Sequence, residues 1–319
     1  MFSRLPAWVL IAAGLVAVPA HANIAVVLNS GDESLSIVDT ATFKEVARRP
    51  IGKEPHHLMK TPDDRYLIVA NAASNELVFL DPATGGEIRR LPNISDPYQI
   101  AFSPDQKWFV SASNRLDRID IYDAKDFKLV KRLPAPKVPS HIAFDQASRF
   151  AFVTLQESDE IVAIDLGTQE IVWKMKTGKQ PAGIWMTPDD RHLLVGITGD
   201  KHVEVIDWRE RKLVKKLVTG QGAHNFLPVG DGRHVLLSNR IANTVSVIDQ
   251  QTIEVKESFS VPGGPDCMEL SKDGKQLWVT SRWARQVVVL DFGTKKILTT
   301  IPVGKSPHGI FLKDHAPRR

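Results

Sequence analysis

The sequence repeats every 42 residues, and this period limits what the chain can fold into more than any other feature. An apolar run that ends in aspartate occurs seven times. The aspartates are Asp39, Asp81, Asp123, Asp165, Asp207, Asp249 and Asp291. A second register with the same step is marked by Pro55, Pro97, Pro139, Pro181, Pro265 and Pro307, with Ala223 in the one remaining place. Two registers without an insertion indicate seven structural units of one kind.

Each unit contains four short β-type runs separated by turn residues. In the first full unit we expect strands over residues 57–60, 66–71, 76–81 and 87–91. Four antiparallel strands in about 40–45 residues are typical of a β-propeller blade, and no helical period interrupts them. The sequence therefore predicts an all-β fold, a seven-bladed β-propeller of four-stranded antiparallel blades.

The two ends of the chain predict how the ring closes. Residues 25–29, 35–39 and 46–51 match the second, third and fourth strands of a unit, and no first strand precedes them. The missing first strand stands at residues 308–312. We therefore expect a composite blade, with strand A from the C-terminus and strands B–D from the N-terminus, which hides the strand edges at the closure.

Several segments carry a family pattern. The strand-like segments 66–71, 235–239 and 277–281 read YLIVAN, VLLSN and LWVTS, and the turn at 271–275 reads SKDGK. In these segments the chain resembles the YVTN family of β-propeller repeat proteins, in the cytochrome d1-like propeller superfamily. The resemblance covers the whole chain after residue 22 and implies the propeller fold. It leaves function open, because similar proteins include periplasmic proteins of unsettled role, metal chaperones, a haem d1-binding domain and lactonases.

The first 22 residues have the pattern of a signal peptide. Arg4 precedes an apolar run over residues 7–20, and Ala20-His21-Ala22 gives the cleavage pattern. The apolar run is shorter than the roughly 18–20 residues that span a bilayer. We expect a mature periplasmic protein that begins at Asn23, a single propeller over residues 23–319, and no membrane insertion after cleavage.

Composition excludes some cofactors and makes some partners unexpected. Cys267 is the only cysteine, so an intramolecular disulfide and covalent c-type haem, which needs a Cys-x-x-Cys-His site, are both excluded. The formal net charge is +4, and basic and acidic residues are interspersed along the whole chain. Such a mild excess is typical of a solvated mixed surface, and we expect no nucleic-acid partner.

Polar residues gather just after the repeat proline, where the innermost strand of each blade meets the mouth of the central channel. The first position holds His56, Tyr98, Ser140, Ala182, His224, Asp266 and His308. The second position holds His57, Gln99, His141, Gly183, Asn225, Cys267 and Gly309. Five of the nine histidines after residue 22 fall in these 14 positions, whereas random placement would put fewer than one there.

Ring closure places four of these residues on adjacent blades, in the order His224, Asp266, His308 and His56. Three imidazoles with one carboxylate suit zinc, and imidazole also suits copper. We predict a zinc or copper site with these four residues as ligands. On the opposite arc, the small residues Ala182 and Gly183 are expected to leave room for a ligand to enter. The alternative is that the histidines are only a polar lining of a water-filled mouth.

Arginines stand near the same mouth. Arg240 and Arg282 occupy equivalent positions in adjacent units, and a pair of arginines can bind a carboxylate or phosphate in bidentate fashion. The alternative is ordinary surface ion pairing. The residues that we expect to contact a small ligand are His57, Tyr98, His141, Arg115, Arg240, Arg282 and Trp283.

These features favour a non-enzymatic periplasmic protein that holds a metal ion, a metal complex or a small anionic ligand, as a chaperone or carrier for another periplasmic protein. A redox or haem d1-like tetrapyrrole protein and a lactonase-like hydrolase are the enzymatic alternatives. Hydrolysis usually needs two groups with separated pKa values, and Asp266 is the only carboxylate in the two positions. A protein-interaction scaffold is the third possibility.

Overall fold

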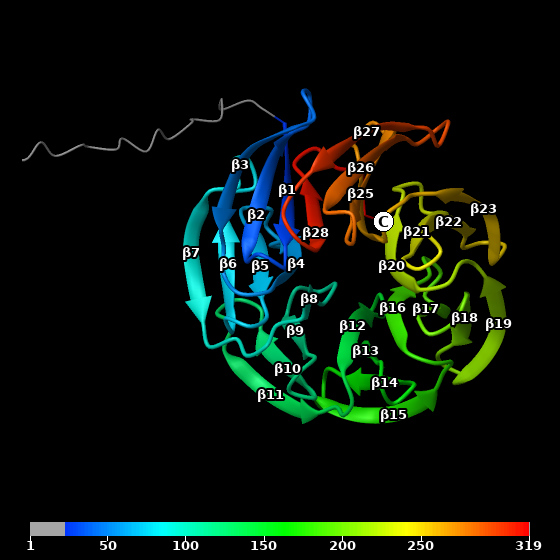
Figure 1. The fold of residues 1–319 in the computed structure, drawn as a ribbon. Coiled ribbons are helices and arrows are strands. Elements are labelled where there is room, and N and C mark those ends of the chain that lie inside the picture. The colour runs from blue at the N-terminus through cyan, green and yellow to red at the C-terminus, as the bar shows by residue number, and fades with distance from the viewer. Residues whose placement is uncertain (1–22, 319) are drawn as a thin grey trace, which may run out of the picture.

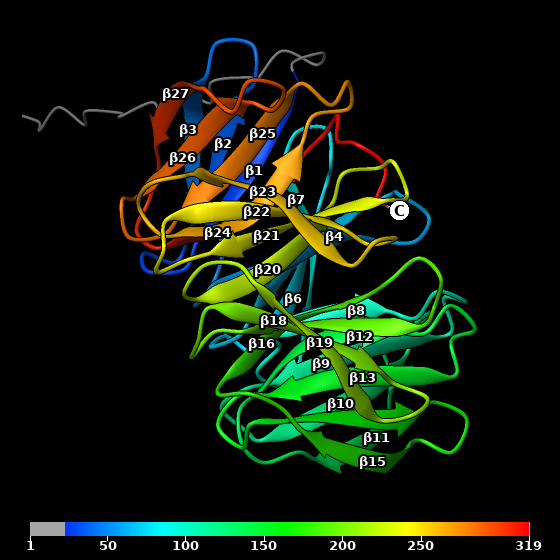
Figure 2. The same ribbon diagram turned by 90° about the vertical axis from the view of Figure 1, so that its right-hand side faces the viewer.

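Seven four-stranded antiparallel sheets stand around a central axis in a computed structural model of the protein (Figure 1). The structure describes residues 23–318, so the predicted signal peptide lies outside the described residues. Viewed from the side, the sheets follow one another face to face around the ring (Figure 2). The described residues contain no helix that is long and apolar enough to cross a membrane. The predicted all-β, seven-bladed propeller is confirmed.

Each blade runs from an innermost strand A to an outermost strand D. The A strands are β28 (Pro307–Leu312), β4 (Pro55–Lys60), β8 (Gln99–Phe102), β12 (Pro139–Phe144), β16 (Pro181–Met186), β20 (Ala223–Pro228) and β24 (Pro265–Leu270). The B strands are β1 (Ile24–Asn29), β5 (Leu67–Asn71), β9 (Trp108–Ser113), β13 (Phe150–Leu155), β17 (His192–Ile197), β21 (His234–Asn239) and β25 (Gln276–Ser281). The C strands are β2 (Ser34–Asp39), β6 (Glu76–Leu80), β10 (Arg118–Asp123), β14 (Glu160–Asp165), β18 (His202–Asp207), β22 (Thr244–Asp249) and β26 (Gln286–Asp291). The D strands are β3 (Lys44–Pro50), β7 (Glu87–Pro92), β11 (Leu129–Pro134), β15 (Glu170–Lys176), β19 (Lys212–Val218), β23 (Glu254–Ser260) and β27 (Ile297–Pro302).

The predicted composite blade closes the ring. Strand β28 pairs with β1 in antiparallel register, with Ala25 opposite Leu312 and Val27 opposite Ile310. Figure 1 shows the last strand, in red, beside the first, in blue. The order of this sheet is β28-β1-β2-β3, so the two ends of the chain are joined by a ladder of backbone hydrogen bonds.

The seven repeat aspartates have a structural role at the turn after each C strand. The Asp39 Oδ1 atom accepts hydrogen bonds from the backbone N–H groups of Ala41 (3.0 Å) and Thr42 (2.7 Å). Such local side-chain bonds stabilise a tight turn and compete with strand continuation. The equivalent carboxylates that accept backbone hydrogen bonds in the same way are Asp81, Asp123, Asp165, Asp207, Asp249 and Asp291.

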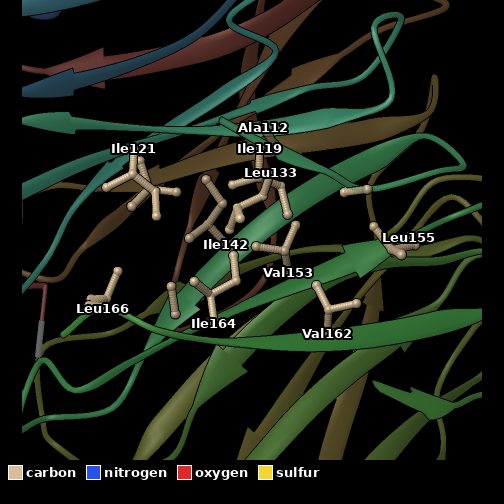
Figure 3. Close-up of a cluster of buried hydrophobic side chains, with 13 residues drawn as sticks. Ala112, Ile119, Ile121, Leu133, Ile142, Val153, Leu155, Val162, Ile164 and Leu166 are labelled. Atoms are coloured by element: carbon tan, nitrogen blue, oxygen red, sulfur yellow. The ribbon is translucent and has the colours of Figure 1, made fainter. Parts of the chain in front are cut away.

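The hydrophobic core lies between neighbouring blades. Figure 3 shows one such cluster, in which Ile119 and Ile121 of β10 pack with Val153 of β13 and Val162 of β14. All four side chains are fully buried. The B and C strands are buried on both faces, because each blade has a neighbour on either side, and they read as nearly continuous apolar runs. Tight packing of the blades fixes the positions of the A strands around the channel.

Candidate functional site

A β-bulge at the start of six of the seven innermost strands positions the candidate residues. In β4, Pro55 stands opposite Asn71 and Leu58 opposite Val69, so three steps along β4 match two along β5. The extra residue leaves His56 and His57 outside the regular ladder. Two consecutive side chains can therefore approach the channel axis, where a regular strand would turn one of them away.

Hydroxyl groups satisfy the backbone at these bulges and link adjacent blades. The Cys267 N–H donates to Thr280 Oγ1 (3.0 Å), and the Thr280 hydroxyl donates in turn to the His308 carbonyl of the next blade (2.8 Å). These bonds hold the bulged backbone rigidly, because a buried N–H without a partner would be costly. In the same way, the His141 N–H donates to Thr154 Oγ1, and the Thr154 hydroxyl donates to the Ala182 carbonyl of the next blade.

Three rings stack where β28, β4 and β8 meet. The His56 ring lies between those of His308 (centroids 3.7 Å apart) and Tyr98 (4.0 Å), each tilted by 31°. His57 approaches the His308 ring edge-on, with centroids 4.8 Å apart. His56 and His308 are 2% and 0% exposed. The predicted adjacency of the last and first A strands is confirmed, but the residues form a buried cluster and not an open mouth.

His57 and His308 share one hydrogen-bonding arrangement. The Nδ1 atom of His57 lies 2.7 Å from the Tyr98 carbonyl oxygen, and the Nδ1 atom of His308 lies 2.8 Å from the His56 carbonyl oxygen. A carbonyl oxygen can only accept, so each Nδ1 carries the proton and each Nε2 carries a lone pair. Both Nε2 atoms are buried and have no hydrogen-bond partner.

Asp266 is fully buried and held by two arginines. Arg240 Nη2 lies 2.9 and 2.7 Å from its two oxygens, and Arg282 Nη1 lies 3.3 Å from Oδ2. Asn225 Nδ2 donates to Oδ1 at 2.7 Å. Burial alone would raise the pKa of Asp266, but Arg240, together with nearby histidines and Arg282, keeps this pKa well below its usual value. The carboxylate that the arginine pair binds thus belongs to the chain itself.

The remaining imidazoles extend the cluster across the channel. His141 Nε2 lies 3.1 Å from Asn225 Oδ1, and the His224 ring meets that of His141 edge-on at 4.9 Å. Burial lowers the pKa of His141 to about 3 and the pKa of His57 to about 4. Burial likewise holds the pKa values of His56, His224 and His308 well below 6.5. The imidazoles are therefore neutral near pH 7, which is the form that binds metals.

Two overlapping groups of side chains could hold a metal ion within residues 23–318. In the first, one ligand atom from each of His56, His57 and His308 lies within 4.8 Å of the others. In the second, Asp266, Cys267 and His308 meet the same limit. His308 is common to both groups, whereas the predicted ligand His224 belongs to neither; its Nδ1 lies 3.4 Å from Asp266 Oδ1.

The expected opening beside Ala182 and Gly183 is absent, and that expectation was wrong. Ala182 is fully buried. A Cβ atom on Gly183 would lie 1.7 Å from the His224 carbonyl oxygen, so the backbone of β20 fills the space that a side chain would need. The small residue permits close packing of two innermost strands and leaves no gap between them for a ligand to enter.

Arg115 and Trp283 stand apart from the cluster in their contacts. Arg115 pairs with Glu54 and, at 2.6 Å, with Asp96. Trp283 is 57% exposed. Within the described residues, no ion pair or ring contact joins either side chain to the histidines. Of the predicted ligand contacts, His57, Tyr98, His141, Arg240 and Arg282 come together in the structure.

A cavity of about 240 Å³ continues along the channel from the cluster. His57, Asn225 and Cys267 line it, together with Glu269 and Arg318, which form an ion pair. Burial raises the pKa of Glu269 to about 7 in spite of the arginine. The repeat analysis did not identify Glu269 and Arg318 as site residues. Cys267 stood in the second polar position, but its chemistry there becomes visible only beside His308, whose Nδ1 lies 3.6 Å from the thiol.

The sequence of the chain was compared with models of known protein families. The model of the YNCE-like β-propeller family matches residues 4–318. The chain belongs to this family. No match was found among curated proteins.

Solved structures with the same fold include three with different descriptions. The chain is similar to a functionally unknown protein from Desulfotomaculum acetoxidans DSM 771 (TM-score 0.78, 16% identity, covering 92% of this chain and 100% of that one). It is also similar to the dihydro-heme d1 dehydrogenase NirN in complex with DHE, with a TM-score of 0.67 and 18% identity over 91% of this chain and 75% of that one. A third similar structure is the hydrazine synthase of Kuenenia stuttgartiensis, with a TM-score of 0.66 and 19% identity over 80% of this chain and 88% of that one. Identities this low establish a shared propeller fold and no shared activity.

Proposed function

We propose that this YNCE-like propeller is an exported, non-enzymatic metal-binding protein that holds zinc or copper in its central channel. The observation that carries the proposal is the pair of buried Nε2 atoms on His57 and His308, neither of which has a hydrogen-bond partner. An unpaired buried polar atom is costly, and two that face one cluster call for a ligand. A metal ion held by the group of His56, His57 and His308 would supply such a ligand, and His308 Nε2 also lies 3.5 Å from Asp266 Oδ2.

The surroundings of these atoms fit a metal ion. Histidines that bind metals usually donate their other ring N–H to a carbonyl or carboxylate, which fixes the ring and its tautomer. His57 and His308 each make such a bond to a backbone carbonyl. Stacking of His308 on His56 further restricts the ring. The ligand atoms are therefore oriented before a metal ion arrives.

The other candidate functions find less support in the site. The cavity of about 240 Å³ lies below the roughly 300–1,000 Å³ of typical small-molecule pockets, so a haem d1-like group would require the innermost strands to separate. An anionic ligand would have to displace Asp266 from Arg240 and Arg282. A hydrolytic mechanism lacks a free carboxylate at the cluster, because the oxygens of Asp266 are already bonded.

We propose that the metal ion is cargo, carried to another periplasmic protein. All five clustered histidines come from innermost strands of the ring, on β4, β12, β20 and β28. This role would make the chain a metal chaperone or carrier in the periplasm.

Titration calorimetry of the mature chain with Zn²⁺ and with copper tests the proposal. We expect one ion per chain, and His57→Gln or His308→Gln should weaken binding by about 10–100-fold. His192→Gln, at the start of β17, is the matched control and should bind as the wild type does. Melting temperatures of all variants separate lost binding from lost folding; His57 is the more exposed of the two ligands and the safer substitution. Binding of neither metal by the wild type would refute the proposal.

A further inference from the structure

We propose that the C-terminal tail, residues 313–318, is a displaceable strap that closes the lower end of the central channel and controls access to the histidine cluster from that end. The lower end is where the innermost strands finish, opposite the repeat prolines near which they begin. The inference rests on the proposed function only in naming a metal ion as what passes the strap. Three observations support it: the course of the tail, its ion pair with Glu269, and the cavity behind that pair.

The tail crosses the ends of two neighbouring innermost strands after it leaves β28. The Ala316 N–H donates to the Leu270 carbonyl, at the end of β24, over 2.8 Å. Further along, the tail passes the turn between β20 and β21, where a Cβ atom on Gly230 would lie 2.9 Å from the Pro317 carbonyl oxygen. The tail therefore runs along the lower rim of the channel, from the composite blade to the blade of β20.

Arg318 reaches from this tail into the channel. Its guanidinium forms an ion pair with Glu269 of β24, and both residues line the cavity of about 240 Å³. The Arg318 side chain is 37% exposed and the Glu269 side chain 5%, so the pair extends from solvent to the cavity wall. Among residues 23–318, Arg318 makes the one hydrogen bond to the Glu269 carboxylate. A buried carboxylate without its partner is costly, so Glu269 retains the tail.

The cavity behind this ion pair extends to the histidine cluster. His57 lines it, together with Cys267. The other imidazoles of the proposed metal site, those of His56 and His308, are 2% and 0% exposed, so solvent does not reach them directly. We therefore expect an ion that enters from the lower end to pass the strap and to meet the His57 imidazole first.

The contacts of the tail are few enough to open locally. His315 forms an isolated bridge with Ser271, Ala316 packs in an apolar cluster, and Arg318 makes its ion pair. Terminal segments with few buried apolar contacts open at a lower free energy than the whole fold does. Release of the tail would leave all seven blades paired, because β28 ends at Leu312.

Alkylation of Cys267 by iodoacetamide tests the strap on the full mature chain without any metal ion. Cys267 is the only cysteine and lines the cavity, so its labelling rate, followed by intact mass, reports access to the cavity. We expect Arg318→Ala to raise this rate by about tenfold. Arg318→Lys can keep the ion pair and should label near the wild-type rate. The matched control is Arg48→Ala, which removes a similarly exposed arginine paired with Glu45 and should change nothing.

Two features of the experiment separate access from other causes of faster labelling. Loss of the Arg318 charge would disfavour the thiolate, which is the reactive form, so a faster reaction cannot come from a more reactive thiol. Labelling is repeated in low urea, because a rate set by global unfolding rises steeply with urea whereas a rate set by local opening does not. Equal rates in Arg318→Ala and wild type, or an increase that follows global unfolding, would overturn the strap.

Stopped-flow mixing with Zn²⁺ distinguishes the strap from the proposed function. Arg318→Ala should speed association and dissociation of Zn²⁺ by a similar factor and leave the affinity within about twofold of wild type. Unchanged rates in a variant that binds Zn²⁺ would overturn the role of the strap in ion access and leave the metal-binding function standing. Binding of no metal by the wild type would overturn the proposed function, and the labelling of Cys267 would still decide whether the tail closes the channel.

Discussion

Acidification should destabilise this protein through its buried imidazoles, and His141 offers the clearest measure. The side chain is 2% exposed, and burial lowers its pKa from 6.5 to about 3. Above pH 6.5 the ring is neutral in both the folded and the unfolded chain, so it contributes no pH dependence. Below that value the unfolded chain binds a proton that the folded chain does not, and stability falls until the pH reaches about 3.

The two pKa values give the size of the effect. Between pH 7.5 and pH 5, a shift from 6.5 to about 3 makes unfolding easier by about 2 kcal/mol for this one residue. The other clustered histidines act in the same direction, since burial lowers each of their pKa values. Glu269 acts in the opposite direction, because burial raises its pKa to about 7 and it is easier to bury when protonated. A comparison of two chains that differ only at residue 141 cancels these other contributions.

Urea unfolding of wild type and His141→Gln at pH 7.5 and pH 5, with metal removed by a chelator, measures the effect. The glutamine variant should be less stable at pH 7.5, because it loses the bonds to Ser140 and Asn225. On acidification it should lose about 2 kcal/mol less than the wild type does. Equal losses in the two chains would mean that His141 titrates at its ordinary pKa in the folded state, and would refute the argument from burial.

Three further predictions concern the composite blade, the packing of β16 on β20, and the predicted signal peptide. A chain truncated after Gly304 lacks β28, and this loss exposes the backbone edge of β1. The truncated chain should therefore show no cooperative unfolding transition by circular dichroism. A melting temperature equal to that of the full chain would contradict the composite blade. In urea unfolding, Gly183→Ala should lower the free energy of unfolding by at least about 3 kcal/mol, because the new Cβ meets a backbone carbonyl. The control Gly293→Ala should lower it little, since a Cβ there meets only the Asp291 carboxylate at 3.5 Å. Equal losses in the two variants would contradict the tight packing of β16 on β20. Intact-mass measurement of protein from a periplasmic extract should give a chain that begins at Asn23, and a mass that includes the first 22 residues would contradict export with cleavage.

Sequence alone predicted the fold because the repeat encodes local structure seven times. The aspartate that caps each turn and the proline that begins most innermost strands act within a few residues of their own positions, so their spacing can be read without knowing the tertiary structure. Closure was also predictable, since a unit without a first strand at one end and a lone first strand at the other leave a single pairing. These are short-range signals, and repetition makes them strong.

The site was only partly predictable. Its position after the repeat proline, and the adjacency of His308 and His56, followed from the register and the closure. The sequence did not indicate the bulge that brings His57 and Cys267 into the cluster beside their neighbours. It also suggested an entrance at Gly183, where the structure has close backbone packing.

The difference lies in the range of the interactions. Strand and turn patterns depend on neighbours in the chain, whereas the state of a channel residue depends on six other strands that converge on it. Whether Asp266 is free to bind a ligand is decided by Arg240 and Arg282, and whether His308 has a free nitrogen is decided by the His56 carbonyl 252 residues away. The sequence by itself determined the seven-bladed propeller and the polar positions that line its channel. Tertiary packing decided which of those polar atoms are already bonded, because only converging strands bring their partners within hydrogen-bond distance.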